Sequence, residues 1–205
     1  LQNRTATLAI ENARLDGNSL ALELVLTSQV GHKFPSGFPS RRAWLHLVVT
    51  DASGAVVFES GAVQADGRVS GNDNDDDAAL AEPHYELITT PDQVQIYEAI
   101  MQDAEGAVTS TLLRGAGYFK DNRLLPAGFV KEDQLDDIAV HGAALADPDF
   151  AGGGDRVRGG VEVGNGGQDP RWAAEERATS NEDAEGEAGQ SQAGQRGTLP
   201  RTAIR

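Results

Sequence analysis

Residues 31–47 read GHKFPSGFPSRRAWLHL, and the fold predicted for the whole chain is organised around this stretch. Its first nine residues contain two glycines and two prolines. Proline fixes φ and lacks an N–H group, so this composition excludes a helix and predicts a rigid loop. The loop carries His32, Lys33, Arg41 and Arg42, and an apolar segment begins directly after it. A loop constrained in this way is typical of a segment that holds another group in place.

Strand patterns precede the loop. Residues 20–26 have a leucine at every second position, which is the periodicity of a strand with one buried face. A partly alternating segment at 5–14 comes before them, and the turn sequence Asp-Gly-Asn at 16–18 joins the two. The chain therefore begins as an antiparallel hairpin.

Strand patterns also follow the loop. Residues 43–50 place Leu45, Leu47 and Val49 on one face, and a turn leads to a return strand at 55–58. Further strands are predicted at 93–101, 138–145 and 156–163. Short strands separated by turns predict an all-β fold, namely an antiparallel β-sandwich of immunoglobulin-like type with long structured loops.

The composition changes sharply beyond Gly164. In this stretch the large apolar residues are Trp172, Leu199 and Ile204, set among glycine, alanine and polar residues. Such a segment buries too little apolar surface to offset the loss of chain entropy on folding. We therefore predict a β-sandwich domain at 1–163 and a low-complexity, disordered tail at 164–205.

The charge and the lack of cysteine restrict the classes of function. The chain has 32 acidic and 17 basic residues, a formal net charge of -15, which argues against nucleic acid or an anionic membrane surface as a partner. No apolar run approaches the roughly 20 residues of a membrane helix, so we expect no membrane insertion. Without cysteine, disulfides, thiolate metal sites and covalent haem attachment are excluded within this chain. Because the chain begins at Leu1, we expect a fragment whose targeting information lies upstream.

Two histidines are candidate ligands. The proline-braced loop holds the His32 imidazole off the predicted sheet, where it can ligate a transition metal or haem iron. The alternative is an ordinary loop histidine that bonds a backbone carbonyl. His84 follows Pro83, and the two histidines could share one metal, although their separation in sequence does not require it.

An acidic segment is a candidate cation site. Asp73, Asp75 and Asp77 lie in the sequence GNDNDDD at 71–77, whose four aspartates resemble a calcium loop in composition. The run lacks the spacing of an EF-hand, so a solvated acidic loop is the alternative. No complete nucleophile, phosphate-binding or paired-carboxylate motif is found, and the sequence does not predict a catalyst.

Four stretches together resemble the C-terminal region of a family of periplasmic multihaem c-type cytochromes. They are residues 31–45, 71–75, 82–85 with 93–98, and 120–126, and the resemblance extends over about residues 5–163. It implies a β-sandwich that packs against an upstream haem-binding domain, where Cys-x-x-Cys-His motifs hold haem c. It also implies that His32 or His84 supplies an axial haem ligand, and that the partners are this haem domain and other redox proteins. This chain departs from the family in its Gly- and Glu-rich terminus, for which a frameshifted or divergent end is our hypothesis.

Three functions follow from these observations. The first is a non-catalytic module of a multihaem cytochrome that supports electron transfer. The second is a secreted β-sandwich, stabilised by Ca²⁺ at Asp73, Asp75 and Asp77, that binds a polysaccharide or protein. The third is a metal-dependent enzyme built on His32 and His84. The first two place the chain in the periplasm or outside the cell.

Overall fold

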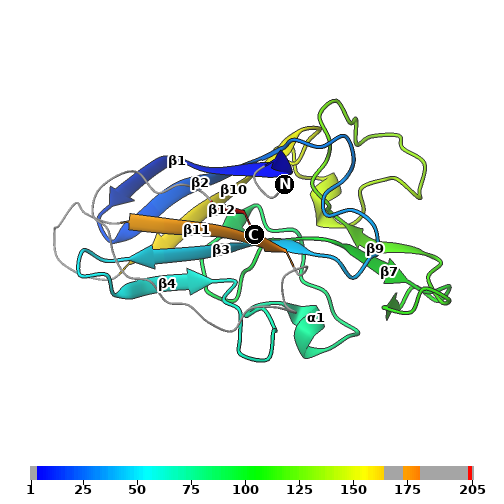
Figure 1. Ribbon diagram of the computed structural model, residues 1–205, viewed down its shortest axis with the longest axis horizontal. Helices are drawn as coiled ribbons and strands as arrows, with labels where there is room; N and C mark the ends of the chain where they lie inside the picture. The colour runs from blue at the N-terminus through cyan, green and yellow to red at the C-terminus, as the bar shows by residue number, and fades with distance from the viewer. Residues whose placement is uncertain (1–3, 164–172, 181–202, 205) are drawn as a thin grey trace.

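The computed structural model describes residues 4–163 and the backbone of 173–180 and 203–204. Two sheets form two layers, seen above and below one another in Figure 1. The first contains, in spatial order, β1 (Ala6–Asp16), β2 (Ser19–Ser28), β10 (Gly154–Glu162) and β5 (Leu87–Ile88). The second contains β12 (Ala203–Ile204), β11 (Ala173–Ser180), β3 (Ala43–Thr50) and β4 (Val56–Ser60), and β6 (Ile96–Tyr97) also pairs with β3. The predicted all-β, sandwich-like fold is confirmed.

A third, smaller sheet lies toward one end of the molecule, at the right of Figure 1. It contains β8 (Val108–Thr109), β7 (Ala99–Gln102) and β9 (Gly117–Asp121). The long loops at this end include the four-residue helix α1 (Asp73–Asp76) and a single 3₁₀ turn at Ala143–Leu145. No helix in the described ranges is long and apolar enough to cross a membrane.

The core follows the predicted alternation. Leu22 and Leu24 of β2 are 2% and 1% exposed, and they pack with Leu45 and Leu47 of β3 in one buried cluster. Strand β10 contributes Val157 to the same cluster. Because β10 pairs with β2 along its whole length, its inward face is in register with the leucine face of β2.

Two strand predictions were wrong in part. The stretch 93–101 is divided between β6 and β7, which belong to different sheets. The division falls at Glu98, whose backbone N–H donates to the Asn122 side chain (3.0 Å) and not to a neighbouring strand. The stretch 138–145 contains an isolated bridge at His141 followed by the 3₁₀ turn, with no named strand.

The predicted tail lies mostly outside the described residues. Within it, β11 pairs antiparallel with β3 from Ala173 opposite Thr50 to Ser180 opposite Ala43. The sequence predicted no strands in this tail, whereas the structure has β11 and β12 there. The boundary at residue 163 and the disorder of the remainder stay predictions.

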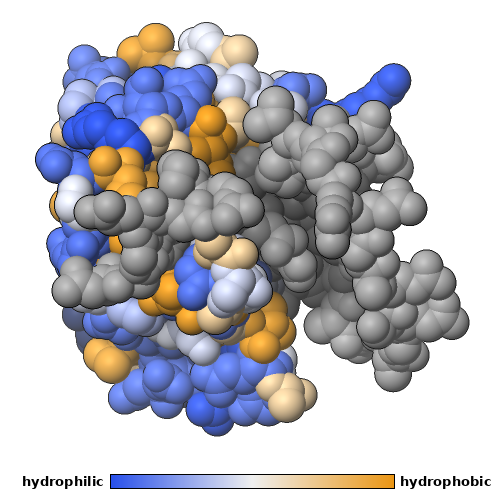
Figure 2. Space-filling model, turned by 90° about the vertical axis from the view of Figure 1, so that its left-hand side faces the viewer, coloured by the Kyte–Doolittle hydropathy of each residue, from blue (hydrophilic) through white to orange (hydrophobic). Residues whose placement is uncertain are grey.

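The described surface combines hydrophilic areas with exposed apolar side chains. Viewed from the left-hand end of Figure 1, the described surface is mainly hydrophilic, with small hydrophobic areas between (Figure 2). Several large exposed apolar side chains lie between residues 112 and 145, in and after the small sheet. They are Leu112, Leu113, Phe119, Val130, Leu135, Ile138 and Leu145.

Candidate functional site

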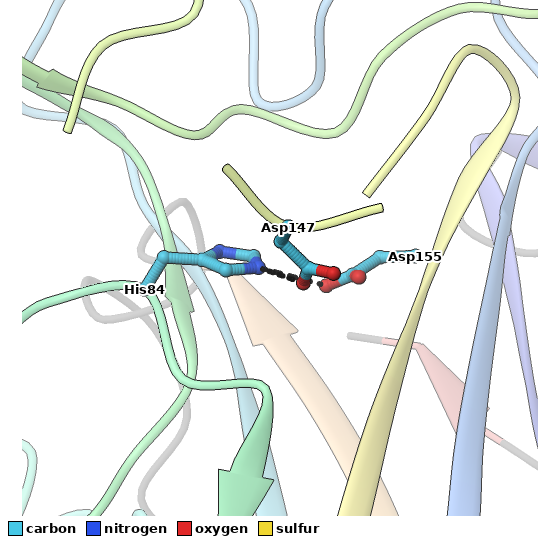
Figure 3. Close-up of side chains that lie close together, drawn as sticks. All are labelled: His84, Asp147 and Asp155. Carbon is cyan, nitrogen blue, oxygen red and sulfur yellow. Dashed lines mark hydrogen bonds and ion pairs between the residues drawn. The ribbon is translucent and has the colours of Figure 1, made fainter. Parts of the chain in front are cut away.

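A buried group of polar side chains surrounds His84. The imidazole points toward two carboxylates, with Nε2 3.1 Å from Asp147 Oδ2 and 3.7 Å from Asp155 Oδ2 (Figure 3). The Tyr97 hydroxyl donates to the same Asp155 oxygen at 2.7 Å. All four side chains lie in the interior, and the ring of Phe150 packs edge-on against His84 with centroids 5.0 Å apart.

Strand alternation accounts for the burial of Asp155. In β10, residues 155, 157, 159 and 161 are all buried, so Asp155 occupies the inward face that Val157 and Val161 continue. Its other oxygen accepts the backbone N–H of Arg156 at 2.7 Å. An aspartate therefore stands where the pattern otherwise supplies an apolar residue, at the end of the core that faces the loops.

The opposite side of the His84 ring is fixed by two amides. The Gln95 amide oxygen accepts from the Tyr85 backbone N–H (2.7 Å), and the Asn122 amide oxygen accepts from the Glu98 backbone N–H (3.0 Å). Both NH₂ groups are consequently turned toward His84 Nδ1, at 2.7 and 3.1 Å. Because Nδ1 faces only donors, it must carry a lone pair, and the ring proton lies on Nε2 and donates to Asp147.

Burial shifts the protonation of this group. It lowers the pKa of His84 to about 4, although the hydrogen bond with Asp147 acts in the opposite direction. Burial also raises the pKa of Asp155 to about 7, against the hydrogen bond from Tyr97. Near neutral pH the histidine is thus neutral, and Asp155 is poised between its two protonation states.

The spacing of these groups resembles that of metal ligands. His84, Asp147 and Asp155 each offer a ligand atom, and these atoms lie within 4.8 Å of one another. Ligands at about 2.1 Å from a tetrahedral or octahedral ion are roughly 3.0 to 3.4 Å apart, close to the observed separations. The hydrogen bonds fit a metal poorly, however. A metal on Nε2 would displace its proton, and a neutral ring would then have to place that proton on Nδ1, against two N–H donors.

A second buried network adjoins the first. Lys120 Nζ donates to Glu82 Oε1 at 2.5 Å and to Glu98 Oε1 at 2.8 Å. Burial and the neighbouring Glu98 raise the pKa of Glu82 to about 8. Burial acts to raise the pKa of Glu98, but Lys120 and the hydrogen bond with Glu82 together hold it below its ordinary value, and the two glutamates raise the pKa of Lys120 against the effect of burial. One carboxylate is therefore charged and the other holds a proton, so the network is close to neutral overall.

The other predicted histidine, His32, has a different environment. It is exposed, and its Nδ1 lies 3.0 Å from the backbone carbonyl oxygen of Lys33. A carbonyl oxygen only accepts, so Nδ1 carries the proton and Nε2 carries the lone pair. In the described part of the chain, His32 and His84 do not share a group of ligand atoms.

The three predicted calcium ligands lie in and directly after α1. Both oxygens of Asp75 are bound by Arg42, at 2.7 and 2.9 Å, and Asp77 accepts the backbone N–H of Ala79. Within the described ranges, Asp73, Asp75 and Asp77 do not bring three ligand oxygens within 4.8 Å of one another. Calcium binding at this segment stays a prediction.

Sequence reasoning found His84 but missed the residues around it. Asp147 and Asp155 lie 63 and 71 positions further along the chain, and no local motif connects them to His84. One usable signal was the aspartate at the inward position of the β10 alternation. A second was that Gln95 and Asn122 belong to the stretches that carry the family resemblance.

The comparisons with known proteins give one structural neighbour. A penta-heme cytochrome c552 from Thermochromatium tepidum is similar to 80% of this chain, at 14% sequence identity and a TM-score of 0.42. The match spans 29% of that cytochrome chain. No protein-family model matches, and no curated protein matches. Similarity at this level does not establish a common fold.

Proposed function

We propose that this chain is a non-catalytic β-sandwich module of a multihaem c-type cytochrome. In this proposal it supports electron transfer by packing against the haem-binding domain of the same protein, in the periplasm, where other redox proteins are its partners. Haem c is held mainly by that domain, because this chain has no cysteine for covalent attachment. The module itself contributes one distal histidine ligand.

The observation that carries the proposal is that the four stretches resembling the cytochrome family are bound to one another at one end of the sandwich. The first contacts the fourth through the backbone of Phe34 and Leu124 and the ion pair of Lys33 and Asp121 (2.7 Å). Arg42 joins the first stretch to the second. The third contacts the fourth through Glu82 and Lys120, and through His84 and Asn122. Residues scattered over the sequence thus form one connected unit, so the stretches that carry the resemblance also act together in the fold.

His32 is the residue that fits the role of an axial ligand. A histidine that ligates iron through Nε2 commonly donates Nδ1–H to a backbone carbonyl, which sets the ring orientation. His32 has this arrangement on an exposed loop. If haem is bound, it would supply a redox-active iron, and His32 Nε2 would hold that iron while Nδ1 bonds the Lys33 carbonyl.

His84 does not fit the same role. Its side chain is 1% exposed, and both ring nitrogens are engaged, Nδ1 by amide donors and Nε2 by Asp147. We therefore assign the ligand role to His32 and a structural role to His84. The exposed apolar side chains between 112 and 145 support docking at the same end, because the ion pair of Lys33 with Asp121 joins the His32 loop to β9.

The ligand role is tested in the natural, haem-containing protein. The His32→Ala variant is expected to convert one low-spin haem to high spin, detected by electron paramagnetic resonance and by the shifted absorption of the oxidised protein. His141→Ala is the matched control, because the His141 side chain is also partly exposed but its Nε2 bonds the Asp136 carbonyl. An unchanged haem spectrum in His32→Ala would show that His32 is not a ligand.

A further inference from the structure

A lysine and two glutamates meet in the interior beside the small sheet. Lys120 belongs to β9, Glu98 lies between β6 and β7, and Glu82 comes from the loop that precedes β5. Their side chains are 4%, 5% and 0% exposed, in that order. Lys120 Nζ lies 2.5 Å from Glu82 Oε1 and 2.8 Å from Glu98 Oε1. An amine is therefore enclosed with two carboxyl groups, away from solvent.

The lysine nitrogen is close enough to Glu82 to attack its carboxyl carbon. Because a carbon–oxygen double bond is about 1.23 Å long, Lys120 Nζ lies at most about 3.7 Å from Glu82 Cδ. Reacting atoms in a productive arrangement are about 3 to 3.5 Å apart, and holding them there is equivalent to a very high concentration of both reactants. A small movement of the flexible lysine side chain completes this approach.

The two carboxyl groups are in different protonation states. Burial and the neighbouring Glu98 raise the pKa of Glu82 to about 8, so this group holds a proton near neutral pH. Its second oxygen, Oε2, is buried and receives no hydrogen bond from the described residues, which makes it the hydroxyl oxygen. The pKa of Glu98 is lowered despite burial, so Glu98 is a carboxylate that accepts a proton. The site thus combines an amine, a protonated acid as electrophile and a general base.

We infer that Lys120 and Glu82 become joined by an intramolecular isopeptide bond. Glu98 takes a proton from the Lys120 ammonium group, and the free amine attacks Glu82 Cδ. The C–N bond forms and the bond from Cδ to Oε2 breaks. Oε2 leaves as water, with its own proton and the proton that Glu98 passes to it, and Glu98 accepts the second proton that the nitrogen loses. Two protons and one oxygen leave as water, and no other reactant is needed.

The surroundings make this reaction slow but favour its product. The two glutamates raise the pKa of Lys120, so the free amine is a minor form. The bond replaces a buried ion pair and an oxygen that receives no hydrogen bond, both of which are costly in the interior. Burial also keeps away the water that hydrolysis of the amide requires. This inference goes beyond the proposed function and does not depend on it, because it requires neither haem nor His32.

Lys33 and Asp121 form a comparable pair that lacks the other parts of the site. Lys33 Nζ lies 2.7 Å from Asp121 Oδ2, a similar distance. Arg123, however, donates to both oxygens of Asp121, at 2.9 and 2.7 Å. The other acceptor of Lys33 is the Ala139 carbonyl oxygen, which is not a base. We therefore expect this pair to remain an ordinary ion pair, and it serves as the internal control.

Mass spectrometry of the full chain, held for days at neutral pH and then unfolded in denaturant, tests the inference. The natural sequence is expected to weigh about 18 Da less than its composition requires, the loss of one water. Trypsin should release residues 69–114 joined to residues 115–123, because it does not cut after a modified Lys120. Lys120→Arg and Glu98→Gln should have their full mass, whereas Lys33→Arg should keep the loss. Circular dichroism shows whether each variant is folded.

The mass of the natural chain decides the question even if a variant does not fold. A full mass, with no joined peptide after digestion, overturns the inference. A loss that persists in Lys120→Arg also overturns it, because the missing water then comes from another reaction, such as cyclisation at an aspartate. If folded Glu98→Gln formed the bond as completely as the natural sequence, the role of Glu98 as the base would be wrong.

Discussion

At the scale of single residues, hydrogen-bond direction decides what each histidine can do. The backbone N–H groups of Tyr85 and Glu98 orient the amides of Gln95 and Asn122, and these amides fix the lone pair on His84 Nδ1. At His32 a single carbonyl has the opposite effect and fixes the proton on Nδ1. The buried histidine therefore serves the fold, and the exposed one is left with a lone pair to offer an external partner.

Removal of the His84 side chain should lower the stability of the protein. In His84→Ala, the amides of Gln95 and Asn122 and the carboxylate of Asp147 lose a partner in the interior, so we expect a loss of about 3 to 5 kcal/mol in the free energy of unfolding. Urea denaturation followed by circular dichroism measures it. His141→Ala provides the comparison and should cost no more than about 1 kcal/mol. Equal, small losses in both variants would contradict the structural role of His84.

Asp155 makes stability depend on pH. Its pKa is raised by burial from 3.8 to about 7, so the native state binds more protons than the unfolded chain between these values. Stability from this group is therefore present at low pH and is lost as the pH rises through about 7. The pKa of His84 is lowered from 6.5 to about 4, so this group makes the protein more stable as the pH rises between these two values. Above about pH 6.5 this gain is complete, and it does not offset the loss from Asp155.

The Asp155→Asn variant isolates this effect. Between about pH 6.5 and about pH 8.5, the natural sequence should lose roughly 1 kcal/mol more stability than the variant. Glu82, with a pKa raised to about 8, adds a loss that is common to both proteins. Urea denaturation at the two pH values measures the difference. Parallel changes in the two proteins would mean that Asp155 does not titrate in this range.

At the scale of elements, the sequence predicted a strand correctly where apolar residues alternate along it. The alternation of Leu22 and Leu24 placed β2 correctly, because period two reports burial directly. The division at Glu98 could not be predicted, because it depends on Asn122, far along the chain, taking the backbone N–H that a continuous strand would use. The candidate site could not be predicted for the same reason: Asp155 is placed by the pairing of β10 with β2, and Asp147, which lies outside any strand, is 63 positions from His84 in the sequence.

The close pairing of β10 with β2 depends on glycine at one position. A Cβ on Gly154 would lie 2.2 Å from the Leu26 backbone oxygen, whereas a Cβ on Gly160 of the same strand meets nothing closer than 3.6 Å. Gly154→Ala should therefore destabilise the protein by about 1 to 3 kcal/mol or more, and Gly160→Ala by less than about 1 kcal/mol. Thermal unfolding of both variants makes the comparison. The pairing described here would be wrong if Gly154→Ala were as stable as Gly160→Ala.

At the scale of the whole molecule, the sandwich core is formed between residues 6 and 163. Among the side chains that the structure describes, the buried members of the main cluster run from Ala6 to Val163. The boundary at residue 163 stays a prediction from composition, because the sequence beyond it is poor in large apolar residues. The partnership of β11 with β3 could not be predicted, since an alanine- and glutamate-rich segment gives no strand signal.

A truncated chain tests that boundary. Residues 1–163 are expected to fold and to unfold cooperatively within a few degrees of the full chain, because the truncation retains all the buried side chains of the main cluster that the structure describes. Circular dichroism during heating provides the measurement, and size-exclusion chromatography checks for association through the exposed edge of β3. An unfolded or aggregated product would show that β11 is an essential part of the second sheet.

The central claim, that this chain is a module of a multihaem cytochrome, is tested most directly by the absorption spectrum of the natural protein, as purified and after reduction with dithionite. A pyridine haemochrome assay on the same sample gives the type and number of haems per chain. The account predicts the sharp α band of reduced c-type haem, with several haems per chain. A natural protein that contains no haem would contradict the claim.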